Sequence, residues 1–377
     1  MPIEEVNHQV LLITRNLPPL VGGMERLMQN MASGIAQYSQ LTVIGPQGCA
    51  AFLPHGTRVL ETPAKPIPFL LVSTWLSIRE CRHTKFDLVV GGSGLIGPTL
   101  RILRSLFSYE TLVYLHGLDL VVNNYFYQSV FVPCICDAQK AIVNSQNTRK
   151  IAIEKGVVED RITVINPGTN LPIMPDDKTL ANARTRFGIP FEKIMIFVGR
   201  ITRRKGLSIF IEHSLPVILA AEPRAGLVVV GKNPENSLNQ LGEENDVLSL
   251  VSKKKYRDHI VFLGQLSDSD LAACYALADV HIFPLVDIPG DVEGFGMVAI
   301  EAASLGTPTV AFEVGGVRDA VSSESGCLIE AGEYGRFASA ALRILDGRGP
   351  SAKSCQDYAS KHSWELFNQQ VKVALRA

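Results

Sequence analysis

The sequence predicts two α/β domains, and three observations lead to this prediction. The chain has 377 residues, which is enough for two such domains of ordinary size. In both halves, short apolar runs are followed by glycine-containing loops and then by helix-like segments, which is the order of an α/β domain. A stretch rich in proline and aspartate, residues 171–190, lies between the two sets and is typical of an interdomain connection.

The overall composition indicates a globular protein with no strong electrostatic partner. Of the residues, 46% are apolar and 19% are charged, and the formal net charge is −1. A net charge this small gives no indication of a nucleic-acid partner held by bulk charge. The seven cysteines are odd in number and include no C-x-x-C pair, so the sequence predicts neither a disulfide framework nor a zinc site.

The expected location is the cytoplasm. The first eight residues contain no basic n-region of a signal peptide, and no apolar run reaches about 18 residues, the length of a membrane-spanning helix. One segment leaves peripheral contact with the inner face of a membrane open. Residues 100–107 place Arg101 and Arg104 beside apolar side chains, and a basic amphipathic helix can lie on an anionic membrane. Such a helix is more often core-facing, with solvated arginines.

In the first half, apolar runs predict a series of buried strands. These runs are Val10–Thr14, Leu41–Ile44, Leu88–Val90, Thr111–Leu115 and Ala141–Ser145, with shorter ones at Arg58–Thr62 and Ile162–Ile165. The loop with Gly22 and Gly23 follows the first strand and precedes a helix from Met24 through Ile35. His116 follows another strand directly, and the carboxyl end of a strand is where an open α/β sheet binds ligands. A lone histidine is usually structural, so its position is what makes it a candidate.

In the second half, strands are expected at Ile194–Val198, Leu227–Val230, Ile260–Leu266, Val280–Leu285 and Thr309–Phe312. Gly199–Gly206 follows the first of these and opens a helix at Leu207–Leu219. Arg200 and Lys205 lie in this loop. Two fixed cations at a helix start suit a diphosphate leaving group, on which negative charge accumulates. An exposed basic loop would explain Arg203 and Arg204 equally well.

The stretch from Asp291 to Glu301 has the strongest site character. Gly294 and Gly296 allow close approach of the backbone to a ligand, and free N–H groups at a helix start attract anions. Glu293 is expected in the loop and Glu301 about two turns into the helix that follows, roughly 12 Å away along a helical rise. Two carboxylates so placed could hold hydroxyls at both ends of an extended ligand, such as a sugar and a ribose joined by a diphosphate. Two solvated surface glutamates are the alternative.

These residues resemble a known family. Glu293-Gly294-Phe295-Gly296 with Glu301 is similar to the E-x7-E motif of retaining glycosyltransferases of family 4, which have the GT-B fold. Gly199–Gly206 matches the family's G-R-x-x-x-x-K-G pattern, and Pro18-Pro19 with Gly22-Gly23 is similar to the family's first loop. The matches occur in the family's order along nearly the whole chain. Thr169 and Asn170 depart mildly from the usual pattern at their position.

The resemblance implies a fold of two Rossmann-like domains facing across a cleft. Residues 1–172 would form the acceptor-side domain and residues 173–357 the donor domain. A C-terminal helix at about 358–377 would pack back on the first domain.

The resemblance also implies residue roles. His116, Arg200, Lys205 and Glu293 would be the catalytic group: Arg200 and Lys205 clamp the diphosphate, Glu293 holds sugar hydroxyls, and His116 lies on the sugar-facing wall. Glu301 would hold the ribose, and the strand ending at Leu266 would meet the base. The full donor-binding set is Gly22, Gly23, Gly199, Arg200, Lys205, Gly231, Leu266, Gly294, Phe295, Gly296 and Glu301.

The implied activity is a retaining, hexosyltransferase-type reaction. A hexose such as mannose or glucose, or a deoxy or N-acetyl derivative, would move from a nucleotide diphosphate to a glycan or lipid-linked acceptor, in bacterial cell-surface polysaccharide synthesis. No Asp-x-Asp motif stands in a site position, so neither a required metal nor a cofactor beyond the nucleotide sugar is expected.

The sequence leaves three other hypotheses about the function open. An epimerase with a GT-B-like fold would release the sugar unattached, so incubation with donor alone would reveal epimerised sugar. Phosphorylases that use pyridoxal phosphate are much longer chains. A non-catalytic sugar-binding protein would need no cation pair at a leaving group and is normally exported with a signal peptide.

Overall fold

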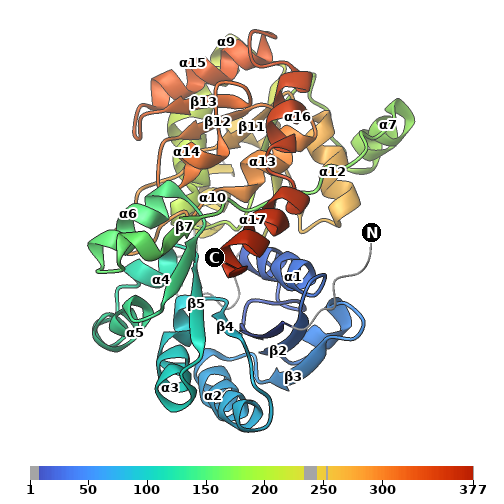
Figure 1. Cartoon of the computed structure of the whole chain (residues 1–377). Helices are drawn as coiled ribbons and strands as arrows, with labels where there is room; N and C mark the ends of the chain where they lie inside the picture. The colour runs from blue at the N-terminus through green and yellow to red at the C-terminus, as the bar shows by residue number, and fades with distance from the viewer. Residues whose placement is uncertain (1–7, 233–243, 252–253, 377) are drawn as a thin grey trace. The chain divides into compact units, whose positions relative to one another are not determined.

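The computed structural model describes residues 8–232, 244–251 and 254–376, and the chain divides into two compact units. Unit 1 consists of Met1–Gly168 and Trp364–Ala377, and unit 2 of Thr169–Ser363. The division therefore lies after Gly168 and not after residue 172. Both units are α/β domains with a wholly parallel sheet, as the sequence predicts (Figure 1).

The sheet of unit 1 has seven strands in the order β3-β2-β1-β4-β5-β6-β7. Their bounds are β1 Gln9–Ile13, β2 Gln40–Pro46, β3 Arg58–Thr62, β4 Leu88–Gly91, β5 Glu110–Leu115, β6 Lys140–Val143 and β7 Ile162–Val164. The main helices are α1 Gly23–Ile35, α2 Pro66–His83, α3 Gly97–Phe107, α4 Leu118–Val121, α5 Val132–Cys136 and α6 Gln146–Glu154. The chain runs outward from β1 through β2 and β3 and then returns to β4, so the topological switch point lies between β1 and β4.

The sheet of unit 2 has six strands in the order β10-β9-β8-β11-β12-β13. Their bounds are β8 Lys193–Val198, β9 Ala225–Val230, β10 Ile260–Gly264, β11 Val280–Phe283, β12 Thr309–Phe312 and β13 Gly326–Ile329. The helices are α7 Asp177–Arg186, α8 Leu207–Ile209, α9 Leu215–Ala221, α10 Glu244–Val251, α11 Lys254–Arg257, α12 Asp268–Leu277, α13 Met297–Ser304, α14 Val317–Ala320, α15 Tyr334–Leu345 and α16 Ala352–Ser360. Here the switch point lies between β8 and β11.

The strands were visible in the sequence because parallel strands are buried on both faces. Every residue from Val10 to Ile13 is fully buried, and so are most of those in β8 and β9. Such strands appear as continuous apolar runs and not as an alternation.

The C-terminal segment and the connection differ from the prediction. Residues 358–377 were expected as one helix, but the chain breaks between α16 and α17 (Trp364–Arg376). Helix α16 packs in unit 2, where Cys355 and Ala359 contact Ala303 of α13, whereas α17 packs against α1 in unit 1 (Figure 1). The connection at 171–190 contains a helix, α7, which Asp176 begins by accepting a hydrogen bond from the Thr179 N–H.

Candidate functional site

The loops that leave β8 and β11 meet at the switch point of unit 2. The N–H of Val286 donates to the Arg204 carbonyl at 2.9 Å, which ties the two loops together. Gly206, with φ 68°, lies so close that a Cβ there would stand 1.9 Å from the Pro284 carbonyl oxygen. Only glycine fits this position, because the conformation is left-handed and the space is filled by backbone. The sheet thus brings the Gly199–Gly206 loop beside the stretch that contains Glu293, at the edge where open α/β sheets bind ligands.

A cluster of four charged side chains lies at this junction. Lys205 Nζ donates to Glu293 Oε2 at 2.7 Å, and Arg204 Nη1 donates to the same oxygen. Arg204 Nε donates to Asp291 Oδ1 at 3.1 Å. The side chains are largely buried, with 9% of Arg204, 10% of Lys205 and 13% of Glu293 exposed. Burial makes these charge-assisted hydrogen bonds stronger than surface pairs of the same geometry.

The environment of the cluster lowers the pKa of both Glu293 and Lys205, which favours the charged form of Glu293 and disfavours that of Lys205. Burial alone raises the pKa of Glu293, but the charges of Arg204 and Lys205 outweigh it and lower that pKa to about 2. Burial lowers the pKa of Lys205, and Glu293 only partly offsets this because Arg204 and Arg200 repel the ammonium. Two cations, Arg204 and Lys205, stabilise the charge of Glu293, whereas Lys205 shares its carboxylate partner with Arg204. Glu293 is therefore firmly ionised, whereas the positive charge of Lys205 is only partly compensated by Glu293.

The Lys205 ammonium packs on an aromatic ring, which in turn stacks on a histidine. The ammonium lies 4.7 Å from the centre of the Phe283 ring, a cation–π geometry. His281 is fully buried next to that ring, and its Nδ1 is 3.0 Å from the Thr309 hydroxyl. Burial, followed by the charge of Lys205, lowers the pKa of His281 to about 3, so this histidine stays neutral and adds no charge to the site.

The backbone of Glu293 is fixed by the loop after β12. The Gly316 N–H donates to the Glu293 carbonyl at 2.8 Å, and a Cβ on Gly315 would lie 2.4 Å from the same oxygen. Helix α13 then begins at Met297, after Gly296 in the left-handed region with φ 105°. The sequence pattern indicates a helix from Phe295 onward, so the predicted start lies two residues too early. Glu301 is therefore only about one turn into the helix. Of the eight residue steps from Glu293 to Glu301, only the four from Met297 onward are helical, and they account for about 6 Å of rise.

The basic residues of the Gly199–Gly206 loop differ in their exposure to solvent. Arg200 and Arg203 are exposed, whereas Arg204 is buried with Lys205. Arg200 still acts on the site, since its charge lowers the pKa of Lys205. Arg204 is a site residue that the sequence analysis missed. The signal that could have found it is the pair of acids at Asp291 and Glu293, which in a buried loop require cationic partners.

The other donor-side positions lie on neighbouring strands of the same sheet. Gly231, with φ 142°, follows β9 and packs on Gly199, where a Cβ would stand 1.9 Å from the carbonyl oxygen. Its N–H donates to the Gly264 carbonyl at 2.8 Å. Leu266, just after β10, is half-buried against the core of unit 2. Phe295 is buried, and Gly294 is partly exposed beside it.

In unit 1, His116 lies at the carboxyl end of β5 and is almost completely buried. Its Nε2 is 2.9 Å from the Gly92 carbonyl, so Nε2 carries a proton and donates it to that oxygen. Its backbone N–H donates to Asp119, and Asn144 donates to its carbonyl. His116 thus links the loops after β4 and β5, next to the switch point of unit 1.

Gly22 and Gly23 form the start of α1. A Cβ on Gly22 would lie 2.4 Å from Glu25 Oε2, and Glu25 is itself buried. The neighbouring Val21 is strongly exposed. The glycines therefore permit a tight entry into α1 from the carboxyl end of β1.

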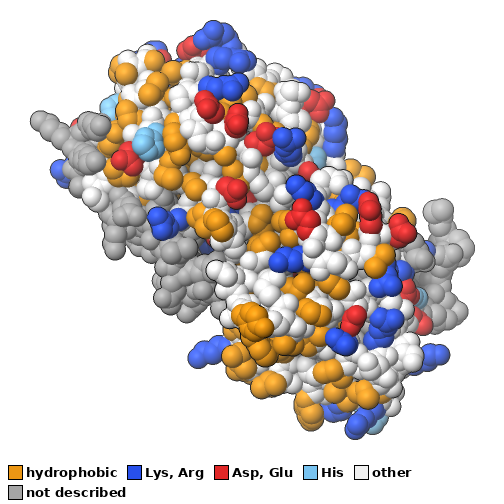
Figure 2. Space-filling model, turned by 90° about the vertical axis from the view of Figure 1, so that its left-hand side faces the viewer, with side chains coloured by type: hydrophobic (Ala, Val, Ile, Leu, Met, Phe, Trp, Pro, Cys, Tyr) orange, Lys and Arg blue, Asp and Glu red, His pale blue; other side chains and the backbone are white. Residues whose placement is uncertain are grey.

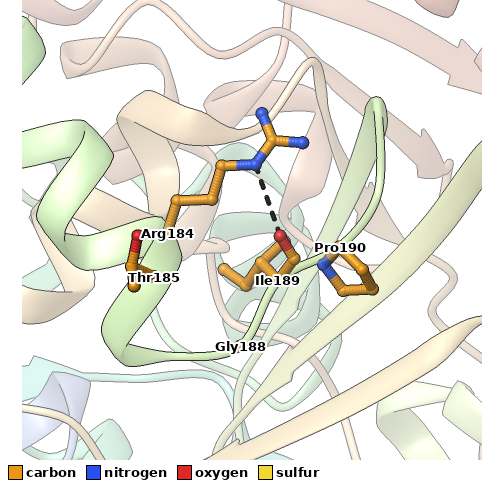
Figure 3. A pocket seen from close by; sticks show the side chains of 5 residues that line it. All are labelled: Arg184, Thr185, Gly188, Ile189 and Pro190. Carbon is orange, nitrogen blue, oxygen red and sulfur yellow. Dashed lines mark hydrogen bonds between the residues drawn. The ribbon is translucent and has the colours of Figure 1, made fainter.

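A surface depression elsewhere in unit 2 is separate from the charged cluster, and its one charged side chain binds backbone carbonyls. It has a volume of about 360 Å³ and is lined by Arg184, Thr185, Gly188, Ile189 and Pro190 (Figure 3). Arg184 donates through Nε to the Ile189 carbonyl at 3.3 Å and through Nη2 to the Phe191 carbonyl, so it serves the backbone. The depression precedes the amino end of β8, about 20 Å along that strand from the charged cluster.

Comparisons with known proteins agree with this architecture. Residues 21–172 match the family model Glycosyltransferase Family 4, and residues 192–347 match the model Glycosyl transferases group 1. The chain belongs to glycosyltransferase family 4 and is a glycosyltransferase of the GT-B type.

The curated relatives include D-inositol 3-phosphate glycosyltransferases. That of Corynebacterium urealyticum is 26% identical over 98% of this chain and 95% of the relative. That of Mycolicibacterium smegmatis is 31% identical over 60% of this chain and 50% of the relative.

Solved structures share the fold over the whole chain. Anabaena Alr3699/HepE, in complex with UDP and glucose, has a TM-score of 0.80 at 19% identity and covers 98% of this chain and 100% of its own. Sucrose-phosphate synthase from Thermosynechococcus elongatus has a TM-score of 0.77 at 24% identity and covers 98% of both chains.

Proposed function

We propose that this glycosyltransferase moves a hexose or hexose derivative from a nucleotide diphosphate to a hydroxyl of a glycan or lipid-linked acceptor, with retention of anomeric configuration. The observation that carries the proposal is the buried pairing of Glu293 with Lys205 at the switch point of unit 2. A firmly ionised carboxylate beside a cation that can change partners is what a sugar bearing a diphosphate needs. The structural neighbour that binds UDP and glucose supports the same class of donor.

The residues would divide the donor between them. Lys205 and Arg200 would receive the diphosphate, where negative charge accumulates as the glycosidic bond breaks. Glu293 would accept hydrogen bonds from sugar hydroxyls and stabilise positive charge on the ring. The N–H groups around Phe295 and Gly296 would hold further oxygens, and Glu301 the ribose. Gly199, Gly231 and Leu266 would shape the nucleotide side.

Front-face attack fits these roles best. The bond between the anomeric carbon and the phosphate oxygen breaks while the acceptor oxygen bonds to the same face. The leaving phosphate takes the acceptor's proton, so no protein nucleophile is required. His116 and the Gly22-Gly23 loop would contribute to the acceptor side, and the setting would be bacterial cell-surface polysaccharide synthesis.

Product analysis tests this proposal. The chain is incubated with uridine and guanosine diphosphate sugars and an acceptor panel that includes glycans, lipid-linked sugars and inositol phosphate. The NMR anomeric coupling of the product should show an α-linkage from an α-linked donor. An inverted linkage would contradict the retaining assignment, and epimerised sugar formed from donor alone would favour the epimerase reading.

Activity should persist in excess EDTA, because the cations of the site take the place of a divalent ion. Among the described residues, no three His, Cys, Asp or Glu side chains gather as a metal site. The measurement is turnover before and after chelation. Loss of turnover in EDTA that magnesium or manganese restores would contradict the prediction.

We also propose that unit 1 contacts an anionic membrane surface through α2 and α3. Ile67, Leu71 and Trp75 follow one another every four residues along α2 and are 74%, 67% and 60% exposed. Leu106 on α3 is 60% exposed, and the Thr74 and Thr99 hydroxyls join the two helices at 2.6 Å. Hydrophobic and basic side chains mix at the lower end of Figure 2, the level of α2 and α3 in Figure 1.

Charge identifies the kind of surface. The exposed face of α2 ends in Arg79 and Arg82, and the Arg79 guanidinium lies 5.2 Å from the Trp75 ring. The one acid of α2, Glu80, is buried and paired with Arg58 and Arg79. Apolar side chains beside basic ones suit lipid headgroups with negative charge. Among the described residues, no helix is long and apolar enough to cross a membrane.

Vesicle sedimentation tests the membrane contact. The chain should sediment with phosphatidylglycerol vesicles and much less with phosphatidylcholine vesicles. Trp75→Glu should lower the bound fraction about tenfold, because it removes a large apolar contact and adds repulsion. Val217→Glu, an equally drastic change at an exposed apolar position of α9 in unit 2, is the control. Equal binding of both variants would contradict the assignment.

A further inference from the structure

Arg204 bridges the two carboxylates of the charged cluster. Its Nε donates to Asp291 and its Nη1 to Glu293, while the neighbouring Lys205 donates to the same oxygen of Glu293. Glu293 Oε2 therefore has two cationic partners, one of which is also tied to Asp291. None of the roles proposed above for the donor uses Arg204, yet it is as deeply buried as Lys205.

The two cations differ in how firmly they are held. The Arg204 carbonyl accepts from Val286 at 2.9 Å, and its planar guanidinium is fixed at both ends of its fork by carboxylates. Asp291 is itself oriented by a turn in which its N–H donates to the Ile288 carbonyl at 3.0 Å. Lys205 has a flexible four-carbon stem and a compact ammonium. Of the two cations, Lys205 is the one that can change its ion-pair partner without disrupting the contacts that hold the Gly199–Gly206 loop in place.

The charges of the cluster balance before any ligand arrives, since two cations face two carboxylates. A diphosphate adds negative charge and attracts the Lys205 ammonium away from Glu293. We propose that Arg204 is a positioning residue. It keeps Glu293 paired and oriented while the Lys205 ammonium moves from Glu293 to form an ion pair with the leaving diphosphate. This inference rests on the proposed function, because it requires a donor that carries a diphosphate.

Without Arg204, Lys205 would be the sole cation at Glu293. It could then stay with Glu293 and leave the diphosphate without its charge, or it could move and leave a buried carboxylate unpaired. In the second case burial raises the pKa of Glu293, which takes up a proton and loses its negative charge. Both routes weaken donor binding. Loss of the Arg204 charge raises the pKa of Glu293 whatever the role of Arg204, but only a positioning role makes that titration respond more strongly to bound nucleotide in the variant than in the wild type.

The test is the titration of Glu293 in Arg204→Met, followed by carbon NMR of the side-chain carboxyl with and without UDP or GDP. Methionine keeps the apolar stem and removes the charge. The control is Arg203→Met, which makes the same substitution at the exposed adjacent position. In Arg204→Met, Glu293 should titrate at higher pH than in the wild type, and higher still with nucleotide bound. Nucleotide affinity should fall about tenfold, the equivalent of one pKa unit of coupling, while Arg203→Met behaves as the wild type.

A titration of Glu293 that is unchanged in Arg204→Met, or that bound nucleotide shifts no more than in the wild type, overturns the inference. If that variant does not fold, Arg204→Gln, which keeps hydrogen-bond donors and removes the charge, should shift Glu293 in the same direction; the same two results there overturn it equally. A wild-type chain that binds neither nucleotide contradicts the proposed function. The unliganded titration still decides whether Arg204 controls Glu293.

Discussion

Replacing Lys205 with alanine should lower turnover by about 10²–10³-fold, the usual cost of removing one preorganised stabiliser of developing charge. Arg200→Ala should have an effect in the same range. Both side chains would face the leaving diphosphate, and Lys205 is paired with Glu293 at 2.7 Å. The measurement is kcat and KM for the donor in both variants, with exposed Arg203→Ala as the matched control. Near-normal turnover in both variants would contradict the assignment.

The two substitutions differ in their expected effect on the fold. Arg200 is exposed, so its loss should leave the free energy of unfolding nearly unchanged. Lys205 lies in the same loop but is buried over Phe283, so alanine also removes packing. Lys205→Met retains the apolar stem and removes the charge. If turnover falls in Lys205→Met while thermal unfolding stays close to the wild type, the loss belongs to the charge.

Glu293→Gln should slow transfer about 100-fold without abolishing it, and the residual product should keep the retained linkage. Glutamine preserves the hydrogen-bonding shape but removes the charge that would stabilise the sugar ring. A covalent nucleophile changed in this way would lose transfer almost completely. The measurements are single-turnover rates and the anomeric coupling of the product. A glycosyl–Glu293 adduct detected by intact mass in the wild type would refute front-face attack.

The same variant should change the dependence of stability on pH. The folded-state pKa of Glu293, about 2, lies below the ordinary value of 4.5. Its ionisation therefore stabilises the fold above about pH 4.5, and this contribution is lost as the pH falls towards 2. At pH 7 Glu293→Gln should cost on the order of 3 kcal/mol, because it leaves buried cations unpaired. Urea unfolding across this pH range should show a smaller acid-dependent loss in the variant than in the wild type.

The sequence predicted the site loops and every described strand except β13, for a physical reason. Strands buried on both faces are continuous apolar runs, and in each unit the loops that matter follow such runs directly. The helix in the connection was missed because its surroundings are rich in proline, although Asp176 was available as its cap. The break before α17 was missed because both flanking helices are amphipathic, and only their packing partners in the two units distinguish them.

The sequence predicted only some of the residues of the charged cluster. Lys205 and Glu293 belong to motifs with recognisable spacing, whereas Arg204 stands beside Arg203 in a run of basic residues. Local sequence cannot decide which of two adjacent arginines is buried. That choice depends on Asp291 and Glu293, nearly ninety residues later in the chain, which the parallel sheet brings beside the loop.

Nucleotide-sugar binding by the wild type and by Lys205→Met tests the central claim most directly, since it requires no acceptor. A panel of nucleotide diphosphate sugars is screened for stabilisation against thermal unfolding. A bound donor at 100 times its Kd should add about 2.7 kcal/mol to the free energy of unfolding. At least one donor should stabilise the wild type strongly and Lys205→Met far less. Stabilisation of both chains to the same extent, or of neither by any donor, would contradict the central claim.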